Sequence, residues 1–385
     1  MKKPCFYNPE RARKVKVFLP ARRGCVRFGF VFSIFFLKFG GLNICIIVMN
    51  LLFTCVGRRN YLVDFFKREL SGSGIVVGTD ANKYASALSA CDKTAVVPSA
   101  DSPEYVLALL DICRQNDIDM LCPLNDLELP VLARAAHEFK RAGVVVAVSS
   151  PAVVDTCFDK VASADFLSKM GVATARVFTG VGEFSAAAAS GEADFPAVVK
   201  PRWGSGSIGV ELAYDARELR TVFDFIKHKL SSTILRNASL ADWDRAVIIQ
   251  PKLRGDEYGL DVVNDFDGNN AAVFVKKKIR MRAGETDMAQ SCDIPQLSEL
   301  GRKIGTALGH IGNLDCDVFF DGENAAVLEM NPRFGGGYPF THCAGGNVPK
   351  AYLAWASGKT APRECFDNFK TGEIFSKCDR LVGVK

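Results

Sequence analysis

The stretch Asp315-Cys-Asp-Val-Phe-Phe-Asp-Gly-Glu-Asn-Ala-Ala-Val-Leu-Glu-Met-Asn-Pro-Arg333 carries the strongest structural signal in the chain. Two apolar runs flank Asp-Gly-Glu-Asn, a composition typical of turns, so this stretch is predicted to form a β-hairpin. Side chains alternate between the two faces of a strand. Glu329 and Asn331 are therefore expected on one face, and Leu328 and Met330 on the opposite, core side.

One face of this hairpin has the composition of a magnesium site. If the loop spans residues 322–324, Asp317 lies directly opposite Glu329, so two carboxylates and the Asn331 amide share a face, with Arg333 just beyond. Hard oxygen ligands suit Mg²⁺, which commonly binds one or two carboxylates plus substrate phosphates. A surface hairpin with scattered polar residues is the alternative, and the hairpin alone does not decide between them.

The composition is that of an ordinary soluble protein of two or three domains, with 385 residues, 48% hydrophobic and 24% charged. The net charge of +5 combines +9 in residues 1–48 with −4 in the rest. The mildly acidic body gives no electrostatic reason to expect nucleic-acid binding. The 13 cysteines form no C-x-x-C pair, which favours a reducing cytoplasm.

Residues 1–48 differ from the rest of the chain. The apolar run 28–37 follows a basic stretch, but Lys38 and Asn43 interrupt it before it reaches the ~20 apolar residues that a spanning helix needs. We expect Met49 to be the true start, with residues 1–48 a mis-called or disordered leader. A membrane-associated tail is the alternative, and it would be the chain's one membrane contact.

Residues 49–150 alternate strand and helix patterns, which predicts a doubly wound parallel sheet with helices on both faces. Ligand sites in such sheets lie beyond the carboxyl ends of the strands. The first turn, Gly57-Arg58-Arg59, lacks G-x-G-x-x-G, so a dinucleotide site is disfavoured although Asp80 lies where a ribose-binding acid would. Arg58 and Arg59 could instead hold an anionic substrate or simply begin a solvated helix.

A second, α+β domain is expected over residues 151–362, with a lid subdomain at about 172–250 and a tail over 363–385. Ser150-Pro151 is a typical helix entry, and the predicted helix carries Lys160 and ends at Gly171.

The sequence from Val199 to Val210 predicts a strand that ends at a lysine, followed by a Gly/Ser loop. Such a loop lets backbone N–H groups approach phosphate oxygens, although a plain flexible hairpin has the same composition. It is not a Walker A loop. Ser357–Thr360 imitates that motif but lacks its first glycine, so Gly358 is interpreted as a helix stop.

Taken in order along the chain, these features resemble the ATP-grasp superfamily, in the branch near carbamoyl phosphate synthase large subunits, biotin carboxylase and D-alanine–D-alanine ligase. The resemblance covers roughly Met49 to Thr360. It implies a pre-ATP-grasp Rossmann-like domain followed by a two-lobed ATP-grasp domain.

The resemblance also implies the role of each residue. Lys160 and Lys200 contact the ATP phosphates, and a lid, here named the glycine loop, closes over them with Gly204, Ser205, Gly206, Ser207 and Gly209. Adenine pairs with the interdomain strand Gln250, Pro251, Lys252 and Leu253, and Glu257 accepts hydrogen bonds from the ribose. Mg²⁺ or Mn²⁺ is held by Asp317, Glu329 and Asn331, and Arg333 stabilises an acyl phosphate.

Two further segments have weaker signals. Arg280 lies in Arg280-Met-Arg-Ala-Gly-Glu285, where it could neutralise a phosphate or carboxylate and be ordered by Glu285, or belong to a mobile charged loop. The glycine-rich segment 334–337 would pass close to a substrate, and His342 beyond it is expected to be structural.

The resemblance implies an ATP-dependent ligase that joins a carboxylate to an amine through an acyl phosphate, with Lys200, Arg280 and Arg333 as catalytic residues. Small-molecule acids and amines, amino acids among them, would be the partners, and a homodimer is compatible with this interpretation. A bicarbonate-using carboxylase and a non-catalytic ATP-binding module are the alternatives.

Overall fold

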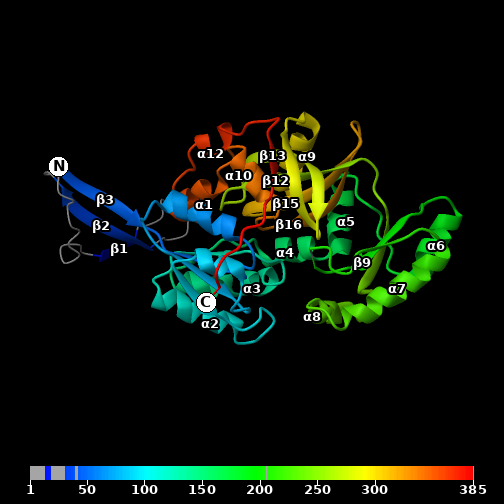
Figure 1. The fold of residues 1–385 in the computed structure, drawn as a ribbon, viewed down its shortest axis with the longest axis horizontal. Helices are drawn as coiled ribbons and strands as arrows, with labels where there is room; N and C mark the ends of the chain where they lie inside the picture. Colours follow the sequence, from blue (N-terminus) through cyan, green and yellow to red (C-terminus); the bar gives the residue numbers. More distant parts are fainter. Residues whose placement is uncertain (1–13, 19–30, 40–41, 205, 385) are drawn as a thin grey trace.

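The computed structural model describes residues 14–18, 31–39, 42–204 and 206–384. Much of the leader expected over residues 1–48 lies outside the described residues. Its described parts form an antiparallel sheet of β1 (Lys14–Phe18), β2 (Val31–Phe39) and β3 (Leu42–Val48), which projects from the left of Figure 1. That Met49 is the natural start stays a prediction, to be tested by N-terminal mass analysis. In the part of the chain that is described, no helix is both long and apolar enough to cross a membrane.

The N-terminal domain is built on a five-stranded parallel sheet in the order β6-β5-β4-β7-β8, as the alternating pattern predicted. Its strands are β4 (Leu51–Thr54), β5 (Val76–Asp80), β6 (Lys93–Val96), β7 (Met120–Pro123) and β8 (Val145–Val146). Its helices are α1 (Asn60–Leu70), α2 (Tyr105–Gln115) and α3 (Leu129–Arg141), with a 3₁₀ turn at Ser86–Ala90. The strand order reverses at β4, so the loops after β4 and β7 open the crevice where such sheets bind ligands.

A six-stranded antiparallel sheet forms the centre of the molecule, in the order β16-β15-β12-β13-β14-β17 (Figure 1). Its strands are β12 (Asp256–Asn264), β13 (Asn270–Arg282), β14 (Glu285–Cys292), β15 (Gly312–Phe320), β16 (Ala325–Asn331) and β17 (Ile374–Ser376). The predicted C-terminal tail is thus partly a strand of this sheet.

Helix α9 (Pro295–Leu308) lies close against this sheet because glycines face it. A Cβ on Gly301 would stand 2.7 Å from a methyl group of Val273 on β13, so a larger residue would push the helix away. The other helices of this part are α10 (Tyr338–Cys343), α11 (Val348–Ala356) and α12 (Glu364–Asp367).

The lid subdomain, green on the right of Figure 1, is a three-stranded antiparallel sheet in the order β10-β9-β11. Its elements are β9 (Ala197–Pro201), β10 (Glu211–Ala213), β11 (Val247–Pro251), α6 (Val181–Ala189), α7 (Ala216–Leu230) and α8 (Arg236–Ser239), with a 3₁₀ segment at Leu240–Arg245. Helices α6 and α7 share one apolar core with this sheet, which contains Phe184, Phe223 and Val199.

The prediction of a single helix that carries Lys160 is wrong, because the chain forms two helices here, α4 (Pro151–Phe158) and α5 (Lys160–Lys169). Asp159 between them is extended, at φ −98° and ψ 112°, and its carboxylate accepts a hydrogen bond from the N–H of Val161. Aspartate competes in this way for backbone donors and favours a helix start over a helix interior. Lys160 consequently begins α5.

Candidate active site

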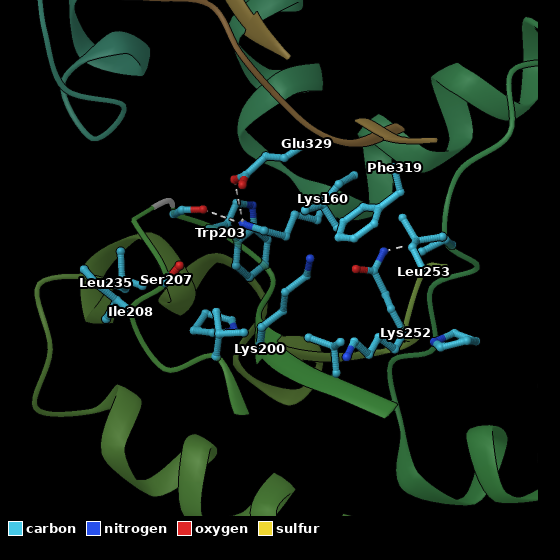
Figure 2. Close-up of a pocket in the computed structure, with 18 residues that line it drawn as sticks. Lys160, Lys200, Trp203, Ser207, Ile208, Leu235, Lys252, Leu253, Phe319 and Glu329 are labelled. Carbon is cyan, nitrogen blue, oxygen red and sulfur yellow. Dashed lines mark hydrogen bonds and ion pairs between the residues drawn. The ribbon is translucent and has the colours of Figure 1, made fainter. Parts of the chain in front are cut away.

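A pocket lies between the lid sheet and the six-stranded sheet, where the sequence predicted a nucleotide (Figure 2). Nine of the predicted residues line it: Lys160, Lys200, Gly204, Ser207, Gln250, Pro251, Lys252, Leu253 and Glu329. Gly206 and Gly209 belong to the same loop without lining the pocket, and Ser205 lies outside the described residues. These motifs, scattered over 170 residues of sequence, therefore converge on one cavity, whereas Glu257, Asp317 and Asn331 do not line it.

Two lysines give one end of the pocket its positive charge. Figure 2 shows the side chains of Lys160 and Lys200 directed into the cavity, with Glu329 beside Lys160. The Lys160 ammonium lies 3.4 Å from the Glu329 carboxylate and donates a hydrogen bond to the carbonyl of Gly204. Burial, aided by the nearby charge of Lys160 and only partly opposed by Glu329, lowers the pKa of Lys200 to about 8. Both ammonium groups suit the anionic oxygens of a phosphate chain.

The other end of the pocket combines apolar walls with one unused acceptor. The side chain of Gln250 donates to the carbonyl of Ala175 at 3.3 Å. Its Oε1 is buried and finds no hydrogen-bond partner among the described residues. An acceptor of this kind beside an apolar wall fits a flat ring that carries an amino group. Sequence reasoning missed the apolar lining residues, which include Trp203, Ile208, Val210, Phe319 and Leu328.

The hairpin pairs Asp317 with Glu329, as predicted. The loop, however, spans Asp321–Asn324, and an irregularity after Asp317 restores the register: Val318 pairs with Val327, so Leu328 is left as the extra residue of a bulge. The expectation that Leu328 points to the core is wrong for this reason, since it lines the pocket next to Glu329. Met330 is fully buried, as expected.

Lys278 joins two of the predicted acids and was not anticipated. Its ammonium lies 2.7 Å from Glu257 and 2.7 Å from Asp317, and its side chain is 6% exposed. Burial alone would lower the pKa of Lys278, but the carboxylates of Asp317 and Glu257 outweigh burial and raise it. Burial raises the pKa of Asp317, an effect that Lys278 partly opposes.

The candidate metal ligands fit a small hard cation that shares its shell with phosphates. Asp317 and Glu329 face each other across the ladder, and Asn331, 7% exposed, follows on the same strand. Over the residues that the structure describes, no group of three or more acids, histidines or cysteines is arranged to hold a metal. Two carboxylates and an amide would therefore leave most coordination positions to phosphates and water, which is the usual pattern for Mg²⁺.

Arg333 is held rigidly at the edge of this site. Its guanidinium lies 2.7 Å from Asp126, in the loop after β7, and 3.0 Å from Asp315 on β15, and its side chain is 7% exposed. The two carboxylates raise the pKa of Arg333 despite its burial. Glu128 organises the loop that carries Asp126 by accepting hydrogen bonds from the N–H groups of Leu124 and Asn125.

Arg280 lies away from this pocket. It bonds to Asp287 at 2.7 Å and reaches Ser376, so the expectation that Glu285 orders it is wrong. Glu285 pairs instead with Lys377 at 3.3 Å and Arg58 at 4.0 Å. Register irregularities on both sides of Arg280 interrupt the regular ladder between β13 and β14 at this residue.

Three further residues outside the pocket lining have informative surroundings: Gly284, Arg59 and His342. Gly284, at φ +78°, touches the glycine loop so closely that a Cβ there would stand 2.7 Å from the Cβ of Ser207. Arg59 is the N-cap residue of α1, and its Nε is buried without a hydrogen-bond partner in the described part of the chain. His342 stacks on Phe65 at 3.7 Å, and burial lowers its pKa to about 4, in keeping with the structural role expected.

Comparison with known proteins agrees with this geometry. Residues 51–147 match a PylC-like N-terminal domain, and residues 244–374 match the family described as ATP-grasp in the biosynthetic pathway with Ter operon. The carbamoyl phosphate synthase large chain of Pseudomonas aeruginosa is 25% identical over 241 residues, 60% of this chain and 21% of that protein. The chain thus spans about a fifth of that relative's length.

Solved structures show the same fold at low identity. The biotin carboxylase domain of Hydrogenobacter thermophilus 2-oxoglutarate carboxylase, solved with MgADP, ADP and bicarbonate, gives a TM-score of 0.67 at 16% identity, covering 84% of this chain and 73% of that one. An L-amino acid ligase of Bacillus licheniformis gives 0.62 at 17%, covering 79% and 74%. Together with the family matches, these likenesses confirm the predicted fold, and the chain is similar to a PylC-like N-terminal domain over residues 51–147 and to an ATP-grasp family over residues 244–374.

Proposed function

We propose that this protein is an ATP-dependent ligase that joins a carboxylate to an amine through an acyl phosphate and releases ADP and phosphate. The observation that carries the proposal is one pocket lined by two lysines, by the Gln250 acceptor and by Glu329, which lies 3.4 Å from Lys160 and pairs with Asp317 across the hairpin.

Each part of the proposed reaction has a residue to serve it. Lys160 and Lys200 would bind the phosphates as point charges, and the glycine loop would close over them and exclude water. Asp317, Glu329 and Asn331 would hold Mg²⁺, which, when bound, neutralises charge on the phosphates.

Arg333 supports the step in which the acyl phosphate forms. Asp126 and Asp315 fix its guanidinium on two sides, so it can present a positive charge at a set position without reorganising. The substrate carboxylate would attack the terminal phosphate beside Arg333, ADP would leave, and the amine would then displace phosphate from the acyl carbon. Here the protein contributes chiefly positioning and charge stabilisation.

The substrates are proposed to enter between the N-terminal domain and the β13–β14 hairpin. Arg58, at the carboxyl edge of the parallel sheet, lies 4.0 Å from Glu285 across this boundary, and Glu285 lies 3.3 Å from Lys377. A cluster with both signs of charge suits zwitterionic molecules such as amino acids. Ten cysteines between Cys55 and Cys378 are free, which supports a reducing, cytoplasmic location. Location and a homodimeric state remain proposals.

A bicarbonate-using carboxylase is the second candidate, because 84% of this chain aligns in structure with a biotin carboxylase domain. Dependence of ADP release on bicarbonate would favour this candidate, whereas dependence on an amino acid and an amine would favour the ligase. ATP binding without turnover under either condition would favour a non-catalytic module.

The site assignment is tested with Glu329→Ala and Lys200→Ala. Both variants are expected to lose ADP formation, measured across a panel of amino acids, while circular dichroism and thermal unfolding show an intact fold. Exposed residues nearby, Glu323→Ala in the hairpin loop and Lys229→Ala on α7, serve as matched controls and should keep wild-type rates. Wild-type turnover in both site variants would refute the assignment.

A further inference from the structure

Lys278 makes an unusual connection across three strands. It lies on β13, Glu257 lies on the neighbouring strand β12, and Asp317 lies one strand further, on β15. Its ammonium nevertheless contacts both carboxylates at 2.7 Å. The side chain must therefore pass over β12 to reach the far strand.

Gly259 makes this crossing possible. It pairs with Asp317 on one side and with Lys276 on the other, directly under the path of the Lys278 stem. A Cβ at Gly259 would stand 3.5 Å from Cε of Lys278 and 3.2 Å from Cε of Lys276. The absence of a side chain on β12 thus leaves the space that the lysine fills.

The two acids that Lys278 joins have different proposed ligands. Glu257 is the proposed ribose acceptor and Asp317 a proposed metal ligand, and their side chains are 25% and 17% exposed. Two carboxylates this close to each other would repel without a cation between them. In the ligand-free protein that cation is the lysine.

We propose that Lys278 is a built-in stand-in for the divalent cation at Asp317, and that it couples loading of the metal to binding of the nucleotide. A free divalent ion must compete with the lysine for Asp317, so its binding free energy there is small. When the nucleotide ribose engages Glu257 and its phosphates offer further oxygens, the exchange at Asp317 becomes favourable. Lys278 is a positioning residue by this reasoning, and the inference rests on the proposed nucleotide site.

The decisive measurement uses Mn²⁺ alone, without nucleotide, on the full chain. Electron paramagnetic resonance or calorimetry would give the Mn²⁺ affinity of wild type and of Lys278→Met. Removing the competing cation is expected to tighten Mn²⁺ binding by at least ~10-fold, as close charge pairs commonly couple this strongly. If Lys278 were purely structural, Lys278→Met would instead weaken Mn²⁺ binding, because the substitution would damage the site.

Matched variants separate this effect from general changes in charge. Lys277→Met removes a neighbouring lysine on the other face of β13, where it pairs with Asp256 in the open, and should leave Mn²⁺ affinity unchanged. Lys278→Arg keeps the cation and should resemble wild type. If Lys278→Met is unstable on its own, its unfolding temperature should rise with Mn²⁺ more than that of wild type.

Measurements of Mn²⁺ binding in the presence of ADP distinguish the role of Lys278 from the proposed nucleotide site. In wild type, ADP should strengthen Mn²⁺ binding strongly, and in Lys278→Met this strengthening should shrink. Wild-type protein that binds no Mn²⁺ even with ADP would refute the proposed nucleotide site. Normal binding of Mn²⁺ with ADP, together with unchanged or weaker binding of Mn²⁺ alone in Lys278→Met, would overturn the role of Lys278 and leave the proposed function standing.

Discussion

Binding of ATP should weaken sharply between pH 7 and pH 9, because Lys200 loses its charge over this range. Lys200 is 5% exposed, and burial together with Lys160 lowers its pKa to about 8, from the ordinary value of 10.5. Its charged fraction then falls from ~0.9 to ~0.1, while the phosphates, with a second pKa near 6, stay fully ionised. If ATP requires the charged form, its apparent affinity falls ~10-fold, or ~1.4 kcal/mol.

Calorimetric titration of MgATP at pH 7, 8 and 9 measures this change, and repeating it in buffers of different ionisation enthalpy counts the proton taken up at pH 9. Lys200→Arg cannot titrate here and should show a flat profile. Equal affinities at pH 7 and 9 in wild type, or the same decline in Lys200→Arg, would refute the reasoning. The free energy of unfolding of the nucleotide-free protein changes with pH in the opposite direction to the affinity for ATP. Between about 8 and 10.5 the unfolded lysine holds more protons than the folded one, so this group's contribution to stability rises with pH.

Two more substitutions test the surroundings of the pocket. Asp126→Asn leaves Arg333 with less compensating charge in a buried site, so we expect a loss of roughly 2–3 kcal/mol in urea unfolding, whereas the exposed Asp155→Asn should cost almost nothing. Equal stabilities would contradict the first expectation. Gly284→Ala should destabilise by ~1 kcal/mol from its positive φ and also raise KM for ATP, because the new Cβ meets the glycine loop. Gly372→Ala has a similar φ, +85°, in open space, so it should share the first effect without the second.

The hairpin could be predicted from sequence because two short-range signals agree there. Alternation puts Glu329 and Asn331 on one face, and Asp-Gly-Glu-Asn places the turn. The bulge at Leu328 has no comparable signal, since any residue can be the extra one in a bulge. The pairing of Asp317 with Glu329 was nevertheless correct because a loop one residue longer than expected and the bulge cancel each other.

The rest of the site depends on neighbours in space that the sequence does not list. Lys278 reaches Asp317 only because β12 lies between their strands and carries Gly259 at the crossing point. In the sequence, Lys278 is one of three consecutive lysines, and alternation separates it from Lys277, which points the other way, but not from Lys276. The contact of Arg333 with Asp126 joins residues 207 positions apart and two domains, beyond any local pattern.

The pocket and its metal edge are electrically balanced before any ligand arrives. Apart from the exposed Lys252, three lysines and three carboxylates occur there: Lys160, Lys200, Lys278, Glu257, Asp317 and Glu329. Buried charges persist only when they are paired, so this balance lets the ligand-free protein fold around its own site. Binding of a nucleotide must therefore replace some of these ion pairs with contacts to the phosphates. Phosphates that attract Lys160 release Glu329, and the released carboxylate is then available to a cation. Metal and nucleotide should accordingly strengthen each other's binding, and the lysines that hold the acids in place set how strongly.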